Sequence, residues 1–132
     1  MTEKQRVLII DDAPMMLRTL NSMLEDDYEI IIAKGGEQGI RSAKMYLPDI
    51  ILLDLMMPGI PGFEVLAELK ADETTKDIPV VLVTGSGSKE DEEKGYDLGA
   101  VDYIKKPFAT KVVQNRVKFN VEYAMMKKEI NK

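Results

Sequence analysis

Five residues of this chain combine side chains that can do chemistry with a shared place in the sequence pattern. Asp11 and Asp12 follow one apolar run, Asp54 follows a second, and Thr84 and Lys106 follow two more. The 132 residues include no cysteine and no histidine, which excludes disulfides, thiolate and imidazole metal ligands, and any triad with a histidine base. What remains is carboxylate, hydroxyl and lysine chemistry, together with oxygen-ligated Mg²⁺.

The apolar runs that precede these residues predict strands alternating with helices. We expect strands over residues 6–10, 29–33, 50–53, 79–83 and 101–105. We expect helices over residues 15–24, 37–47, 63–71, 88–98 and from 109 to the end. Residues 80–83 are apolar at every position, which is typical of parallel strands covered on both faces. The sequence therefore predicts one α/β domain, a doubly wound parallel sheet of five strands with five helices.

The carboxyl ends of the strands in such a sheet form the edge where ligands bind. Asp11, Asp12, Asp54, Thr84 and Lys106 would all lie along that edge. If the first and third strands are neighbours, the three carboxylates repel one another unless a cation is bound. Mg²⁺ suits these ligands, and a carboxylate beside it could attack phosphorus while Lys106 and Thr84 contact the phosphoryl oxygens.

Each of these residues also has a purely structural interpretation. Asp11 and Asp12 could form a helix-capping turn before Pro14, since Asp is common in such turns. Thr84 could be an ordinary loop hydroxyl and Lys106 a solvated surface lysine. Asp54 has less structural justification, because a carboxylate at the end of a buried apolar strand is costly to hold there. Their shared position at strand ends favours a functional site.

Composition limits the class of protein and its partners. Hydrophobic residues make up 45% of the chain and charged residues 31%, which is typical of a globular protein. No apolar run approaches the roughly 18 residues of a spanning helix, and charged residues interrupt the start before a signal-peptide core could form. We therefore expect a cytoplasmic protein without a membrane partner. A net charge of −5 and a pI near 4.8 argue against nucleic acid as a direct partner.

Four segments together resemble a known family. They cover residues 7–12 (VLIIDD), 49–59 (DIILLDLMMPG), 83–85 (VTG) and 99–108 (GAVDYIKKPF). In this order and spacing they resemble the phosphoacceptor receiver domain of two-component response regulators, and the likeness extends from residue 5 to about residue 122. The resemblance implies a flavodoxin-like fold with strand order 2-1-3-4-5.

The resemblance also implies a role for each acidic residue. Asp54 would be the phosphorylated residue, Asp12 a direct Mg²⁺ ligand and Asp11 a ligand acting through water. Met56, two positions after Asp54, would offer its backbone carbonyl to the metal, and its thioether would not bind. Met56 and Ser86 would flank the path of the water that removes the phosphoryl group.

The remaining family positions concern the response to phosphorylation. Thr84 would be the switch hydroxyl that turns towards the phosphoryl group. Tyr103 would be the aromatic ring that moves inward with it, although a tyrosine on a strand more often only packs. Lys106 would bind phosphate, and its peptide bond to Pro107 would be cis, as is common in the family.

The last helix is longer than the sheet requires and carries two apolar stripes. Val113, Val117, Val121 and Ala124 form a stripe suited to packing on the sheet. Phe119, Tyr123, Met126 and Ile130 form another. This second stripe could be a dimer seam, a connector to an absent output domain, or a frayed end. Such a helix resembles those that join receivers to nucleotide-cyclase or phosphodiesterase domains, so residues 1–122 are assigned to a receiver and 123–132 to a helical extension.

The sequence thus favours a signalling receiver that takes a phosphoryl group from a histidine kinase onto Asp54, with Mg²⁺ as cofactor. It would catalyse its own phosphorylation and dephosphorylation without turning over a free substrate. Its partner surface, including any homodimer, would involve the fourth helix, the fifth strand and the final helix. Two alternatives stay open: an interaction module that needs no phosphorylation, and an aspartate-dependent phosphohydrolase, whose usual D-x-D pattern Asp11-Asp12-Ala13 does not match.

Overall fold

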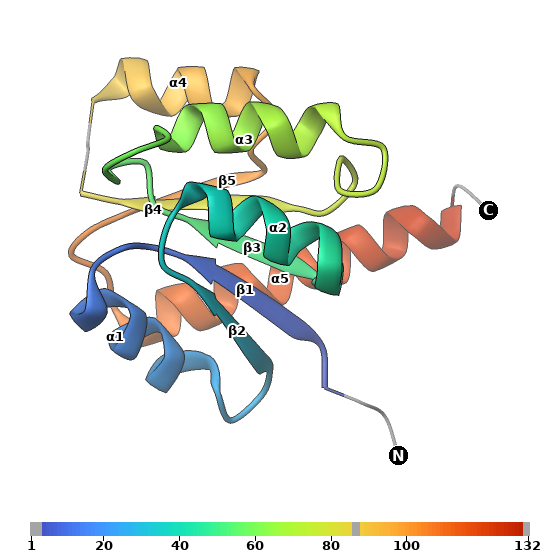
Figure 1. The fold of residues 1–132 in the computed structure, drawn as a ribbon. Helices are drawn as coiled ribbons and strands as arrows, with labels where there is room; N and C mark the ends of the chain where they lie inside the picture. Colours follow the sequence, from blue (N-terminus) through green and yellow to red (C-terminus); the bar gives the residue numbers. More distant parts are fainter. Residues whose placement is uncertain (1–3, 86–87, 131–132) are drawn as a thin grey trace.

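A computed structural model describes residues 4–85 and 88–130 of the chain (Figure 1). The strands are β1 (Arg6–Ile10), β2 (Glu29–Ala33), β3 (Ile50–Leu53), β4 (Val80–Thr84) and β5 (Asp102–Lys105). The helices are α1 (Pro14–Leu24), α2 (Gly36–Tyr46), α3 (Gly62–Ala71), α4 (Lys89–Asp97) and α5 (Thr110–Ile130). Strands and helices alternate as the sequence predicts.

The five strands form one parallel sheet in the order β2-β1-β3-β4-β5. Figure 1 shows α1 and α5 on one face of the sheet and α2, α3 and α4 on the other. The doubly wound, flavodoxin-like fold and its strand order are therefore confirmed. Because β1 and β3 are neighbours, the residues that follow them lie side by side at the carboxyl edge.

Two separate apolar clusters fill the space between the layers. Successive side chains of β1 point to opposite faces, so Val7 and Ile9 contact α1 and α5 while Leu8 and Ile10 contact α2 and α3. All four are fully buried. Burial on both faces is the reason why the strands are apolar at every position rather than at alternate ones.

The boundaries of two strands differ by one residue from the prediction. β4 begins at Val80 and ends at Thr84, so Thr84 is the last residue of the strand rather than the first residue of the loop. Pro79 has no N–H to donate, but its carbonyl still accepts a hydrogen bond from Ile51 N at 2.9 Å. β5 begins at Asp102, since Val101 lies outside the strand.

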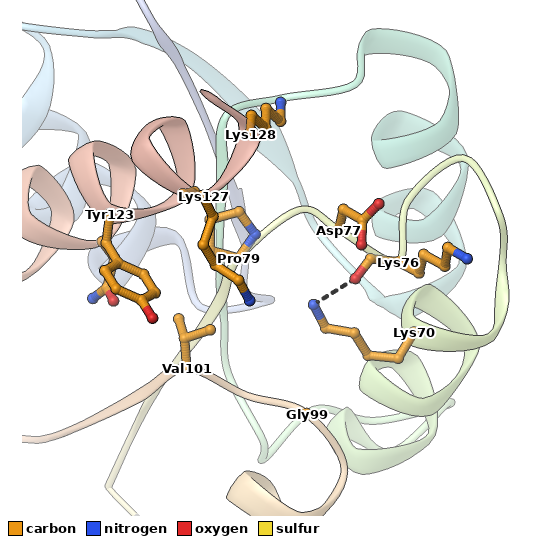
Figure 2. A pocket seen from close by; sticks show the side chains of 11 residues that line it. Lys70, Lys76, Asp77, Pro79, Gly99, Val101, Tyr123, Lys127 and Lys128 are labelled. Carbon is orange, nitrogen blue, oxygen red and sulfur yellow. Dashed lines mark hydrogen bonds between the residues drawn. The ribbon is translucent and has the colours of Figure 1, made fainter. Parts of the chain in front are cut away.

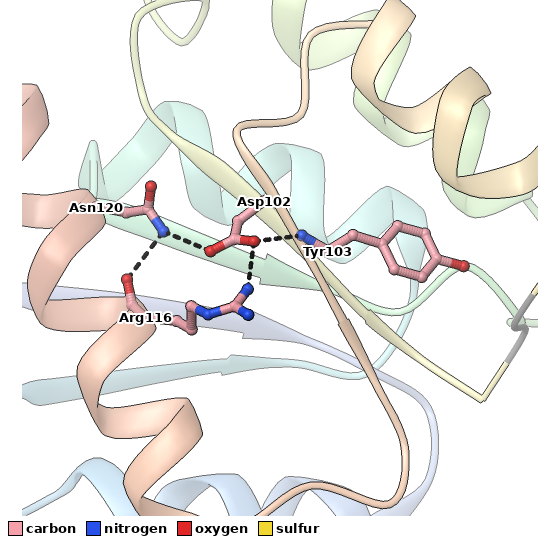
Figure 3. A network of polar contacts seen from close by, with 4 residues as sticks. All are labelled: Asp102, Tyr103, Arg116 and Asn120. Carbon is pink, nitrogen blue, oxygen red and sulfur yellow. Dashed lines mark hydrogen bonds and ion pairs between the residues drawn. The ribbon is translucent and has the colours of Figure 1, made fainter. Parts of the chain in front are cut away.

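A polar network fastens α5 to β5 (Figure 3). The Asp102 carboxylate accepts hydrogen bonds from Arg116 Nη1 at 2.6 Å, Asn120 Nδ2 at 3.1 Å and Tyr103 N at 2.8 Å. Asn120 also donates to the Arg116 carbonyl at 2.9 Å, and it is only 6% exposed. Hydrogen bonds to a charged acceptor are among the stronger ones in proteins, so this network fixes α5 to the strand that carries Tyr103.

The two stripes predicted on α5 differ in burial. Val113, Val117 and Val121 pack in the core beneath the sheet. Phe119 and Tyr123 are 65% and 54% exposed, and their rings stack with centroids 6.4 Å apart. The second stripe continues over exposed Met126 and Ile130. Across the described ranges, no helix, α5 included, has the length and apolar content needed to cross a bilayer.

Candidate functional site

The site begins with three carboxylates that the sheet brings together. Ile10 and Leu53 are paired in the register of β1 and β3, so the residues that follow them are adjacent. Asp54 N donates to the Ile10 carbonyl at 3.0 Å and Asp11 N donates to the Ala33 carbonyl at 3.1 Å, which extends the ladder by one residue. Carboxylate oxygens of Asp11, Asp12 and Asp54 lie within 4.8 Å of one another.

Local backbone groups orient two of these carboxylates. Asp11 Oδ1 accepts a hydrogen bond from Ala13 N at 2.9 Å, and Asp54 Oδ1 accepts one from Met56 N at 3.2 Å. The residue that caps α1 is Ala13, whose methyl group cannot accept a hydrogen bond, so Asp11 and Asp12 do not occupy the capping position. The Asp11 hydrogen bond forms a turn that leads from β1 into α1, and the Asp54 hydrogen bond orients its carboxylate at the end of β3.

The electrostatics of the cluster disfavour three negative charges. Asp11 is 1% exposed and Asp54 is 5% exposed. Burial is the main cause that raises the pKa of Asp11 above its usual value, and the negative charges of Asp54 and Asp12 raise it further. The Ala13 amide and the Lys106 ammonium act in the opposite direction. A bound cation would relieve this repulsion, so the donor set is compatible with Mg²⁺.

Thr84 and Lys106 complete the same edge of the sheet. Thr84 is fully buried at the end of β4, and its carbonyl accepts a hydrogen bond from Lys106 N at 3.0 Å. The Lys106 side chain passes beside Gly85, where an added methyl group would lie 4.0 Å from Lys106 Cδ. The Lys106–Pro107 peptide bond is cis, as expected. The edge therefore combines three carboxylates with a hydroxyl and an ammonium group.

Three further predicted site residues are Tyr103, Met56 and Ser86. Tyr103 is 7% exposed and belongs to the apolar cluster under α2 and α3. The Met56 side chain is 68% exposed, and its backbone N donates to Asp54 Oδ1. Ser86 falls outside the described residues.

Gly62 is a structural requirement of this site that the sequence reasoning missed. It is the first residue of α3, and an added methyl group there would lie 2.5 Å from Leu55 Cα and 2.7 Å from the Asp54 carbonyl. Both neighbours are backbone atoms, which cannot rotate away as a side chain can. The start of α3 thus approaches the Asp54 loop so closely that only glycine fits. The glycine following Pro61 was the available signal, but its packing partner was not visible in the sequence.

Comparison with known proteins agrees with the fold and identifies the family. The family model described as response regulator receiver domain matches residues 7–118. The chain is 38% identical over 126 residues to the response regulator PleD of Caulobacter vibrioides, a match that covers 95% of this chain. The chain belongs to the response regulator receiver domain family.

Solved structures show the same fold. A CheY-like response regulator receiver domain protein from Methanospirillum hungatei has a TM-score of 0.89 and 25% identity, and the match covers 95% of this chain and 99% of that one. The receiver domain of sensor histidine kinase PA1611 from Pseudomonas aeruginosa has a TM-score of 0.84 and 26% identity, with 91% and 99% covered. Its crystal structure has a magnesium ion coordinated in the active site cleft.

The chain matches only part of its longer relatives. It spans 28% of PleD and 25% of another relative. The activities of those whole proteins are therefore not assigned to this chain.

Replacing Gly62 with alanine should disturb the Asp54 loop, because the added methyl group meets backbone atoms. We expect Gly62→Ala to lower the free energy of unfolding by about 1–3 kcal/mol, as overpacking does elsewhere. Urea denaturation measures this change. Gly35→Ala is the control, because no atom lies within 4 Å of the methyl group added there. An equal loss in both variants would show that the close approach at Gly62 is not responsible.

Magnesium should stabilise the fold by relieving repulsion among the carboxylates. In thermal unfolding, we expect Mg²⁺ to raise Tm for the natural chain and to have little effect on Asp12→Ala. Without metal, Asp11→Asn should itself raise Tm by about 2–5 °C, because it removes one buried negative charge while an amide oxygen can still accept from Ala13 N.

Asp97→Asn is the control for these variants, since it removes an exposed carboxylate from α4, away from the cluster. It should retain the full Mg²⁺ response. A Mg²⁺ response in Asp12→Ala equal to that of the natural chain would contradict the assignment of the cluster as a metal site.

Proposed function

We propose that this chain is a phosphorylation-dependent signalling receiver that accepts a phosphoryl group from a histidine kinase onto Asp54. The observation that supports this most directly is the arrangement of Asp11, Asp12 and Asp54, whose carboxylate oxygens lie within 4.8 Å, at the edge that also carries Thr84 and Lys106. A purely structural domain would gain nothing from repulsive charge at this edge. Membership of the receiver family supports the same role.

The proposed metal ligands are Asp12 and Asp54 directly, Asp11 through water and the Met56 backbone carbonyl. Mg²⁺ bound there would neutralise negative charge on the carboxylates and on the incoming phosphoryl group. Hydrogen bonds from Ala13 N and Met56 N keep Asp11 and Asp54 oriented for this task. The Mg²⁺-containing relative PA1611 supports the choice of metal.

In the proposed reaction, an Asp54 carboxylate oxygen attacks the phosphorus of a phosphohistidine. The new P–O bond forms as the P–N bond breaks, and the histidine nitrogen leaves with the electron pair. Lys106 would pair with a phosphoryl oxygen and Thr84 would donate its hydroxyl proton in a hydrogen bond to another. Since these 132 residues contain no histidine, the phosphoryl donor must lie outside them, on a histidine kinase or a small phosphodonor. Hydrolysis of the acyl phosphate by water would reverse the signal.

The route from Asp54 to a partner surface would run through β4, β5 and α5. Phosphorylation adds about 1.5–2 negative charges, which would draw Thr84 and Lys106 towards the new group. Tyr103 lies on β5 directly after Asp102, and Asp102 is bound to Arg116 and Asn120 of α5. A shift of Tyr103 would therefore act on the network that fixes α5. This arrangement supports a partner surface made of α4, β5 and α5.

In this proposal residues 1–122 form the receiver and residues 123–132 extend its last helix. The family match ends at residue 118, whereas α5 continues without a break to Ile130. The exposed stripe on that extension would pair with a second copy or lead to an output domain, and the partial match to longer relatives supports the latter. A cytoplasmic location, where a kinase could reach Asp54, completes the proposal.

Asp54 should be the sole phosphorylated residue. After incubation with acetyl phosphate and Mg²⁺, intact mass spectrometry should show one labile phosphate on the natural chain and none on Asp54→Asn. Asp97→Asn, which removes an exposed carboxylate from α4, should be phosphorylated normally. A phosphate adduct that persists on Asp54→Asn would refute the assignment, and steady turnover of p-nitrophenyl phosphate would favour the phosphohydrolase instead.

Phosphorylation should strengthen self-association through the second stripe of α5. Sedimentation of the chain with and without beryllofluoride should show a larger dimer fraction when the phosphoryl mimic is bound. Tyr123→Glu should weaken the dimer about tenfold or more, because it places a charge in an apolar interface. Lys118→Glu, an exposed change on a different face of α5, should have little effect. A dimer indifferent to Tyr123→Glu would place the interface elsewhere.

A further inference from the structure

A hollow of about 620 Å³ lies at the end of the sheet opposite the aspartate cluster (Figure 2). Its walls come from the end of α3 and the segment that follows, from Pro79 and Val101 just before β4 and β5, and from the last turns of α5. Because these residues precede the strands, the hollow is at the amino edge of the sheet, whereas Asp54 is at the carboxyl edge. Its volume falls in the usual range for small-molecule sites.

The charge of this hollow is opposite to that of the chain. Four lysines and one aspartate line it, although the chain as a whole carries a net charge of −5. Figure 2 shows the ammonium groups of Lys70 and Lys127 facing each other across the space. In residues 4–85 and 88–130, neither group forms an ion pair. Lys76, by contrast, pairs with Glu73 at 3.0 Å.

Lys70 is held in place by the backbone. Its Nζ donates to the Lys76 carbonyl at 3.0 Å and to the Ile78 carbonyl at 2.8 Å. An ammonium group has three N–H donors, so these two hydrogen bonds leave one for a ligand. A positioned donor loses less conformational freedom on binding than a free lysine does.

The positive charges of Lys70 and Lys127 repel each other. Burial lowers the pKa of Lys70, and the charge of Lys127 lowers it further, while Asp77 acts in the opposite direction. An anion between the two groups would favour both of their charged forms. Apart from Asn120, the rest of the wall presents apolar surface from Tyr123, Val101, Ala124 and Pro79, and Tyr123 and Val101 are exposed.

We propose that this hollow binds a small phosphorylated molecule with a planar aromatic ring system, of the nucleoside monophosphate class. The phosphate would lie between Lys70 and Lys127, and the ring system would lie against Tyr123 and Val101. Such a ligand would connect the projecting part of α5 with the segment between α3 and β4. It would therefore act on the same helix as the proposed phosphorylation switch, from the other end of the sheet.

The test is a titration of ¹⁵N-labelled chain, followed by amide NMR shifts, with three probes: AMP, inorganic phosphate and adenosine. Magnesium is omitted so that the aspartate cluster does not attract the phosphates. AMP should shift the amides of Gly99, Val101, Tyr123 and Ala124 and should bind more tightly than either of the other two probes. Lys127→Gln, on the exposed last turns of α5, should weaken AMP binding about fivefold or more, as expected for the loss of a charged contact.

Lys111→Gln is the matched control, since it removes one positive charge from the first turn of the same helix, outside the hollow. It should leave AMP binding unchanged. The proposal is overturned if AMP causes no shifts around the hollow, if Lys111→Gln weakens binding as much as Lys127→Gln, or if phosphate or adenosine binds as tightly as AMP. None of these probes can phosphorylate Asp54, so failure here leaves the proposed phosphoryl transfer unaffected.

Discussion

The register between β1 and β3 is the constraint on which the rest of the site depends. Pairing of Ile10 with Leu53 places Asp11 and Asp54 next to each other at the end of two fully buried strands. The hydrogen bonds of the ladder hold them there although their charges repel. Because the backbone keeps these carboxylates close together, a positive charge beside them is favourable, whether it comes from a metal ion or from Lys106. The hydrophobic core thereby maintains the electrostatic imbalance on which the proposed reaction depends.

At the other end of the sheet the backbone likewise holds like charges near each other, but there the charges are positive. There the backbone carbonyls of Lys76 and Ile78 hold the Lys70 ammonium towards Lys127. One end of the sheet thus gathers carboxylates, and the other gathers the ammonium groups of the lysine-lined hollow. Helix α5 packs along one face of the sheet (Figure 1), and its last turns line this hollow. A parallel sheet supports this division because all its strands begin at one edge and end at the other.

Much of the fold and the acidic site followed from the sequence. The alternation of apolar runs with amphipathic segments depends on local spacing, and it predicted every strand and helix to within a few residues. The three aspartates were recognisable because each follows a buried strand. The limits of β4 were less certain, because Pro79 contributes its carbonyl to the ladder without donating an N–H. The Asp102 network and the lysine-lined hollow depend on contacts between residues far apart in the chain, and the close fit at Gly62 depends on the path of the loop after β3, none of which spacing reveals.

The length of α5 has a mechanical consequence. From Val113 in the core to Ile130 the helix rises about 26 Å, and its outer turns extend past the edge of the sheet (Figure 1). An α-helix is stiff over such a distance, so a tilt of about 5° at the core displaces the far end by about 2 Å. Rearrangements too small to disrupt the packing around Val117 would thus be magnified at Met126 and Ile130. The buried part of α5, which begins at Val113, thus sets the position of the exposed apolar stripe at its far end.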